Sequence, residues 1–106
     1  MEFKRRKWGW YLTLLSAPEY KIKLLYFRRD GEISMQRHDQ RSELWLFLFG
    51  AGDMYTTKSR SKPECKLKGQ RQHVGKFRWH QFCASRRTLV LEIQTGICKE
   101  EDIMRA

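Results

Sequence analysis

The sequence predicts an all-β protein, either a sandwich or a barrel. Three segments have the composition and spacing of β-strands, namely Tyr20 to Arg28, Leu44 to Phe49 and Thr88 to Gln94. Turn signals separate them, and no segment has the period of a long amphipathic helix. Many short strands joined by close turns are typical of these two architectures.

The first strand candidates lie in the N-terminal quarter of the chain. Gly9 to Leu15 has a weak strand pattern, and Tyr20 to Arg28 has a stronger one. In the second segment Lys21 and Lys23 occupy one face and the apolar side chains occupy the other. This alternation is typical of a strand with one buried face.

In the rest of the chain, some segments have a strong strand pattern and others a weak one. Leu44 to Phe49 is apolar on both faces, which predicts a strand in the middle of the core, and Thr88 to Gln94 is a third strong strand. Lys76 to Cys83 is a weaker candidate that contains aromatic residues, and Lys99 to Arg105 predicts a short C-terminal helical turn. The predicted turns are Ala17-Pro18, Asp30-Gly31, Gly50 to Asp53 and Lys68-Gly69.

Length and charge restrict the class of protein. A chain of 106 residues predicts one domain, residues 1–106, with a single core. The formal net charge of +10 favours an anionic partner, which can be a phosphorylated metabolite, a nucleic acid or an acidic membrane surface.

The most basic stretch is Lys58 to His73 (KSRSKPECKLKGQRQH). We interpret it as a solvated hairpin loop with a charged rim, and the alternative is a polyanion-binding loop. Aromatic residues are not interleaved with these charges, so a surface that stacks nucleic-acid bases is the less favoured hypothesis.

Several features favour the cytoplasm as the site of action. The three cysteines are odd in number and show no close pairing, as expected for reduced thiols. The N-terminal KRRK-WGWYLTLLSA resembles a signal peptide, but Gly9 and Thr13 interrupt the apolar part and Ala17-Pro18 is a poor cleavage junction. Leu44 to Phe49, the longest apolar run, is too short to span a membrane.

Four polar residues around the central strand predict a metal site. Gln36 and His38 are two residues apart and share a face of an extended chain, and Glu43 returns to that face after a turn at Asp39-Gln40. His80 is supplied by the later aromatic segment. One amide oxygen, two imidazoles and a carboxylate suit a divalent ion such as zinc, manganese, iron, cobalt or nickel.

Spacing alone leaves two alternatives open for this cluster. Glutamine, histidine and glutamate in a polar loop commonly have no ligand role. His73 competes with His80 as the second histidine, although it lies in the basic segment and is expected to face water.

The same residues resemble the two sequence motifs of the cupin superfamily. GEISMQRHDQRSELWLFLFG resembles the first motif, and GQRQHVGKFRWH resembles the second. Gly75 and Phe77 replace the proline and the glycine that the second motif usually contains. The matching positions are Gly31, Gln36, His38, Glu43 and Gly50 for the first motif, and Gly69 and His80 for the second.

More narrowly, the chain is similar to the cupin domain of type II mannose-6-phosphate isomerases, which is often fused to a mannose-1-phosphate guanylyltransferase. The blocks that carry the similarity are KWGWY, SMQRHDQRSELW and EIQTGICKEEDIMR, in the family's order. The resemblance implies a double-stranded β-helix, also called a jelly-roll barrel, and a divalent metal ion held by Gln36, His38, Glu43 and His80. A departure is Lys7, where the family has proline.

The resemblance also implies an activity, the interconversion of mannose 6-phosphate and fructose 6-phosphate through an enediol. Arg41, Lys23 and Arg6 are candidates for binding the phosphate. For Arg41 the alternative is a salt bridge with Glu43 or Asp39, and for Lys23 and Arg6 it is a solvated charge.

Other roles in the predicted site stay open. Glu92 and Gln94 alternate with apolar residues along one strand, so we expect both to line the cavity. The proton carrier can be His73, Lys23 or Glu92.

Two further functions compete with the isomerase. One is a non-catalytic cupin that binds an anionic ligand or a partner through its basic surface. The other, less favoured, is nucleic-acid binding. We also expect a homodimer that pairs through edge strands, because an uncovered edge in so small a sandwich is a liability.

Overall fold

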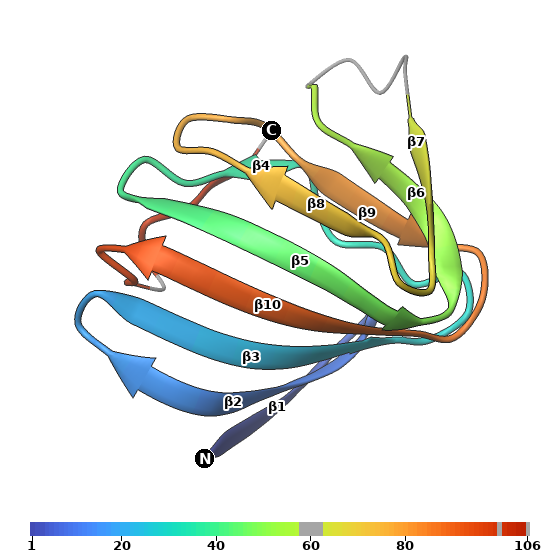
Figure 1. Cartoon of the computed structure of the whole chain (residues 1–106), viewed down its shortest axis with the longest axis horizontal. Helices are drawn as coiled ribbons and strands as arrows, with labels where there is room; N and C mark the ends of the chain where they lie inside the picture. The colour runs from blue at the N-terminus through green and yellow to red at the C-terminus, as the bar shows by residue number, and fades with distance from the viewer. Residues whose placement is uncertain (58–62, 100, 106) are drawn as a thin grey trace.

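Every regular element in the described part of the chain is a β-strand (Figure 1). The computed structural model describes residues 1–57, 63–99 and 101–105. It contains no helix that is long and apolar enough to cross a membrane within those residues. The strands are β1 (Glu2–Arg6), β2 (Gly9–Ala17), β3 (Tyr20–Phe27), β4 (Gln36–Arg37), β5 (Arg41–Phe49), β6 (Ala51–Tyr55), β7 (Glu64–Leu67), β8 (Arg71–Val74), β9 (Gln81–Ala84), β10 (Thr88–Gly96) and β11 (Met104–Arg105).

The strands form a sandwich of two layers. The larger sheet has the order β1-β2-β3-β10-β5-β8, and all its neighbours are antiparallel. The other layer contains the sheet β7-β6-β9 and the pair β11-β4. The bridges Glu32 to Cys83 and Gln36 to His80 continue this layer from β9 toward β4. The all-β prediction is therefore confirmed.

The hydrophobic core lies between the two layers and is rich in aromatic side chains. Phe82 of β9 packs edge-on against Phe27 of β3, with ring centroids 4.9 Å apart. Phe82 also lies 5.3 Å from Phe47 of β5. Because these rings come from both layers and are almost fully buried, they fasten the sheets together.

The four strands expected around residues 9–15, 20–28, 44–49 and 88–94 all form, as β2, β3, β5 and β10. The prediction for Lys76 to Cys83 is only partly right, because the strand there is β9, which starts at Gln81. Residues 75–78 turn instead: Arg78 N–H donates to Gly75 O at 3.3 Å, and Phe77 has a φ of 63°. The turn predicted for Gly50 to Asp53 is shorter than expected, since β6 begins at Ala51.

The C-terminal helical turn that the sequence predicted is wrong. In the described residues of the tail, β11 pairs with β4, with Met104 opposite Arg37 and Arg105 opposite Gln36. The carboxylate of Asp102 accepts hydrogen bonds from the backbone N–H groups of Asp39 and Gln40. These long-range backbone contacts favour an extended tail over a helical turn.

In β3 the face that carries the lysines points into the sandwich, although hydrophobicity alone predicts that this face points to water. In β3 the buried face carries Lys23, Leu25 and Phe27, and Lys23 is only 5% exposed. In β5 one face is buried, but Leu48 and Phe49 are 41% and 42% exposed, so this strand is not enclosed on both sides. The alternation was correctly predicted, whereas the lysine-bearing face of β3 is the inner one.

The basic segment Lys58 to His73 lies partly outside the described residues, which omit 58–62. Its remainder forms β7, a turn around Gly69, and β8. The segment therefore passes from one layer to the other, because β7 pairs with β6 and β8 pairs with β5.

Alanine substitutions at Gly50 and Gly69 test how closely the backbone packs at the junction between β5 and β6. Gly50 and Gly69 both have positive φ, 101° and 87°. A Cβ on Gly50 would lie 2.4 Å from the carbonyl oxygen of Arg87, whereas one on Gly69 would meet nothing within 4 Å. We expect Gly69→Ala to lower the free energy of unfolding by roughly 1–2 kcal/mol. Gly50→Ala should cost a further roughly 1–3 kcal/mol.

Urea denaturation of both variants measures the difference. Equal losses for the two substitutions would show that steric contact at the β5–β6 junction has no energetic weight.

Candidate metal centre

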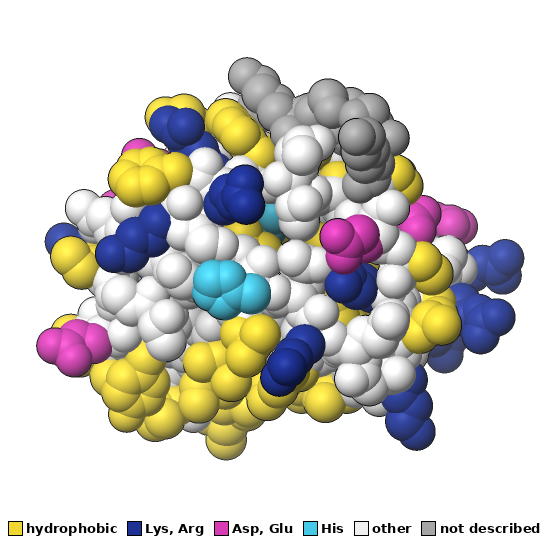
Figure 2. Space-filling model, turned by 45° about the horizontal axis from the view of Figure 1, so that its top comes forward, with side chains coloured by type: hydrophobic (Ala, Val, Ile, Leu, Met, Phe, Trp, Pro, Cys, Tyr) yellow, Lys and Arg dark blue, Asp and Glu magenta, His cyan; other side chains and the backbone are white. Residues whose placement is uncertain are grey.

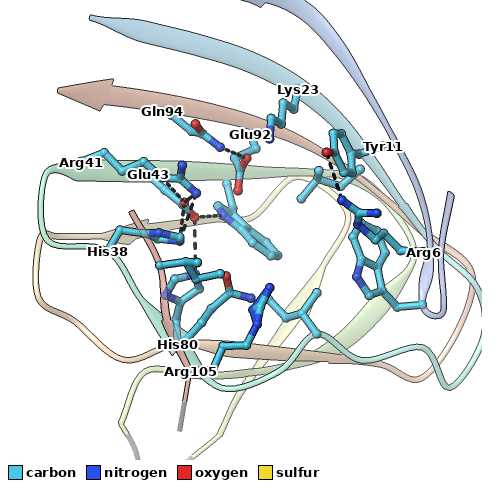
Figure 3. A pocket seen from close by; sticks show the side chains of 16 residues that line it. Arg6, Tyr11, Lys23, His38, Arg41, Glu43, His80, Glu92, Gln94 and Arg105 are labelled. Carbon is cyan, nitrogen blue, oxygen red and sulfur yellow. Dashed lines mark hydrogen bonds and ion pairs between the residues drawn. The ribbon is translucent and has the colours of Figure 1, made fainter. Parts of the chain in front are cut away.

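One cavity of about 140 Å³ opens on the inner face of the larger sheet (Figure 3). Nine of the ten side chains that the sequence analysis named as candidates line it, although they come from segments far apart in the chain, and the tenth, His73, does not. The nine are Arg6, Lys23, Gln36, His38, Arg41, Glu43, His80, Glu92 and Gln94.

The carboxylate of Glu43 is the centre of the cluster. Its Oε2 lies 3.0 Å from the guanidinium of Arg41 and 3.2 Å from His38 Nε2. Its Oε1 accepts a hydrogen bond from Trp45 Nε1 at 3.1 Å and lies 3.5 Å from His80 Nε2. Burial raises the pKa of Glu43, but the hydrogen bond and charge of His80 and the charges of Arg41 and His38 hold it well below its usual range.

Both histidines present Nε2 to this carboxylate. The Nδ1 of His38 contacts the carbonyl oxygen of Asp102, and the Nδ1 of His80 lies 3.4 Å from the carbonyl oxygen of Arg78. With a metal ion bound, a hydrogen on Nδ1 that is donated to these carbonyls would leave the Nε2 lone pair for the ion. Burial, the largest influence, lowers the pKa of His38, which favours the neutral imidazole that a metal ion requires.

This donor set fits a divalent transition-metal ion. Ligand atoms of His38, Glu43 and His80 all lie within 4.8 Å of one another, and the three residues are buried. Gln36 lines the same cavity, and its backbone exchanges two hydrogen bonds with His80, at 2.8 and 2.9 Å. The bridge brings the two histidine-bearing segments together, which places two imidazoles and one carboxylate at a single point.

Arg41 forms a salt bridge with Glu43, which was the alternative role that the sequence suggested for it. The residue is 6% exposed, and its Nη2 lies 3.0 Å from Glu43 Oε2 and 3.1 Å from His38 Nε2. Its guanidinium therefore compensates the charge of the buried carboxylate at Oε2, the same oxygen that His38 Nε2 approaches.

The wall of the cavity is formed by β3 and β10. Lys23 and Glu92 are opposite each other in the register, and Gln94 Nε2 donates to Glu92 Oε1 at 2.7 Å. Burial, reinforced by the nearby charge of Glu43, raises the pKa of Glu92 to about 8. Among the described residues the buried Gln94 Oε1 meets no hydrogen-bond donor, so this oxygen is available to a polar ligand.

The cavity mouth carries cations that are more exposed. Arg6 is exposed and donates to the hydroxyl of Tyr11 at 3.4 Å. Arg105 of β11 lines the same cavity (Figure 3). His73, which the sequence left open as a proton carrier, is exposed and pairs with Leu44 on the outer face.

Sequence reasoning missed three side chains that line the site, Tyr11, Trp45 and Arg105, and the backbone carbonyl of Asp102, which contacts His38. Trp45 was assigned to the core, where it is buried, yet its position two residues after Glu43 on one strand implied a shared face. Arg105 and Asp102 were missed because the tail was predicted to be helical.

The chain has the fold of cupin proteins. The chain superposes on KdgF from Halomonas sp. with a TM-score of 0.80 and 12% identity, over 95% of this chain and 90% of that one. A Desulfitobacterium hafniense cupin superfamily protein gives a TM-score of 0.72 and 18% identity, over 83% and 76%. The double-stranded β-helix fold is therefore confirmed.

Within this class, the chain belongs to the mannose-6-phosphate isomerase C-terminal family, whose model matches residues 2–106. A curated relative is a mannose-1-phosphate guanylyltransferase from Sinorhizobium fredii, 31% identical over 49 residues. The matched region covers 46% of this chain and only 10% of that protein.

The pKa of Glu92 predicts how the stability of the metal-free chain changes with pH. Between its ordinary value of about 4.3 and about 8, the unfolded chain releases the proton and the folded chain retains it. The free energy of unfolding should therefore fall as pH rises through this window. Glu92→Gln should make the fall shallower by up to about 1.4 kcal/mol per pH unit.

Urea titrations with a chelator present, at several pH values across this window, measure both slopes. Glu19→Gln, which removes an exposed carboxyl, is the matched control and should retain the native slope. Identical slopes for the native chain and Glu92→Gln would contradict a raised pKa of Glu92 in the folded chain.

Proposed function

We propose that the chain is a metal-dependent sugar-phosphate isomerase of the mannose 6-phosphate/fructose 6-phosphate type, acting in the cytoplasm. The observation that carries the proposal is the composition of one cavity. It combines a cluster of metal-donor side chains at one end with cationic side chains on its wall and at its mouth. Membership in the mannose-6-phosphate isomerase C-terminal family supports a sugar substrate.

The cations match the phosphate end of such a substrate. Lys23, Arg6 and Arg105 line the cavity, while Arg41 is already engaged by Glu43. Two arginines and a lysine can donate several charge-assisted hydrogen bonds to one phosphate group. The free acceptor of Gln94 suits a sugar hydroxyl.

The reaction moves one proton between adjacent carbons. A base removes the proton from the carbon beside the carbonyl, an enediol forms, and an acid returns a proton to the former carbonyl carbon, so that no net oxidation occurs. A divalent ion bound by His38, Glu43, His80 and Gln36 would supply Lewis-acid stabilisation of the developing oxyanion. Of the three proton carriers that the sequence left open, only Lys23 and Glu92 line the cavity.

A non-catalytic cupin that binds a small anion is the second candidate. The engagement of Arg41 with both Glu43 and His38 favours it, since a guanidinium already neutralises the carboxylate that a metal ion would need. The net charge of +10 suits an anionic ligand in either case.

Conversion of mannose 6-phosphate to fructose 6-phosphate, followed by NMR with zinc, manganese or cobalt present, tests the isomerase directly. We expect conversion of the phosphorylated sugar and none of unphosphorylated mannose. The combination Lys23→Met and Arg105→Met should raise KM by roughly 10–100-fold through lost charge-assisted hydrogen bonds.

Arg71→Met, which removes a cation from β8 without touching the cavity, is the matched control and should retain the native KM. No conversion with any of the metals, together with retained binding of the sugar phosphate, would support the non-catalytic alternative instead.

A further inference from the structure

The tail segment, residues 101–105, lies beside the metal-donor cluster. Its strand β11 pairs with β4 at two positions, and Ile103 and Arg105 line the cavity (Figure 3). Because β4 leads directly to His38, the tail segment is held next to the first histidine of the site. A pair of two-residue strands has little stability of its own, so other contacts have to hold the tail segment there.

Asp102 supplies those contacts through its carboxylate. Its Oδ1 accepts a hydrogen bond from the backbone N–H of Asp39 at 3.1 Å, and its Oδ2 accepts one from the backbone N–H of Gln40 at 2.8 Å. Both N–H groups belong to the bend between β4 and β5, immediately after His38. An ionised carboxylate is a stronger acceptor than a neutral group, so Asp102 ties the tail segment to this bend.

The backbone of Asp102 touches the imidazole of His38 directly. Its carbonyl oxygen contacts Nδ1, while Nε2 on the other side of the ring lies 3.1 Å from Nη2 of Arg41. A carbonyl oxygen can only accept a hydrogen bond, and a guanidinium can only donate one. In the neutral imidazole both contacts are therefore satisfied by a single tautomer, which has its hydrogen on Nδ1 and its lone pair on Nε2.

The orientation of the ring depends on the same carbonyl. Nε2 of His38 lies 3.2 Å from Oε2 of Glu43, and the guanidinium of Arg41 lies within 3.1 Å of both atoms. A ring turned over about its bond to Cβ would lose the contact with Asp102 and would present a carbon in place of Nε2. The carbonyl of Asp102 therefore favours one tautomer and one orientation of His38.

We propose that Asp102 is a positioning residue for the metal centre: its carboxylate holds the tail segment, and its carbonyl holds His38 with Nε2 directed at Glu43. The inference rests on the metal site of the proposed function, to which it adds a residue that is not itself a ligand. The loss of a hydrogen-bond partner behind a histidine ligand typically weakens metal binding by about 10–100-fold.

The neighbouring acid, Glu101, offers a matched comparison. Its side chain is exposed in the same tail segment, and its backbone carbonyl accepts a hydrogen bond from the N–H of Ile103 at 2.9 Å. Glu101→Ala therefore changes the net charge as Asp102→Ala does, but it leaves the two N–H groups of the bend with their acceptors.

Nitrogen-15 NMR of the full chain, with a chelator present, tests the position of His38 without a metal ion. At about pH 8, above the ordinary imidazole pKa of about 6.5, the native chain should carry the His38 hydrogen on Nδ1. Asp102→Ala should give a mixture of both tautomers, and Asp102→Asn, which keeps one acceptor oxygen, should be intermediate. Glu101→Ala should retain the native signals.

His73 provides an internal control in the same spectra. It is the exposed histidine near the middle of Figure 2, because His38 and His80 are buried. Its ring signals should be the same in all four chains, and the backbone amide spectrum shows whether each variant is folded. If Asp102→Ala does not fold, Asp102→Asn should show the smaller shift in the same direction.

Zinc titration of the same four chains measures the consequence for metal binding. Asp102→Ala should raise the dissociation constant for zinc by about 10–100-fold, and Asp102→Asn should raise it by less. Glu101→Ala should retain the native dissociation constant.

Two results would overturn the inference, and a third concerns the proposed function instead. A folded Asp102→Ala chain that keeps the native tautomer of His38, or one that keeps the native zinc affinity, would show that Asp102 does not position the site. A native chain that binds no zinc would contradict the metal-dependent function, and the tautomer of His38 in the metal-free variants would then decide the role of Asp102.

Discussion

The buried carboxylate of Glu43 is the constraint on which the rest of the structure depends. An ionised carboxylate in the interior is costly unless nearby groups compensate its charge and its hydrogen bonds. Arg41 and Trp45 reach it from β5 itself, His38 from the bend before that strand, and His80 from the bridge before β9. The motif spacing therefore places cations, imidazoles and an indole N–H around one point, which creates both a stable polar interior and a set of metal donors.

This polar interior explains the reversed faces of the larger sheet. Because Glu43, Glu92, Gln94 and Lys23 occupy the inner positions of β5, β10 and β3, the alternation of the strands directs their leucines outward. The polar cavity and the leucines on the outer side of the sheet are thus two consequences of one strand pattern.

The sequence predicted most of the strands, and the residues it selected for the site lie together in one cavity. Spacing alone left His73 and His80 as alternatives, and the resemblance to the cupin motifs was needed to select Gln36, His38, Glu43 and His80 together. Periodicity cannot say which face is inside, and so the sequence left Lys23 open between a phosphate-binding role and a solvated charge, of which burial excludes the second. Asp102 and Arg105 depend on a tail that is extended only through long-range pairing with β4, which no local pattern records.

Metal analysis of the chain purified without added metal tests the central claim most directly, with His38→Ala plus His80→Ala as the variant and His73→Ala as the matched control. The account predicts about one equivalent of a divalent transition metal in the native chain and in His73→Ala, and none in the double variant. Absence of metal from all three, with none taken up when zinc, manganese, cobalt or nickel is added, would contradict it.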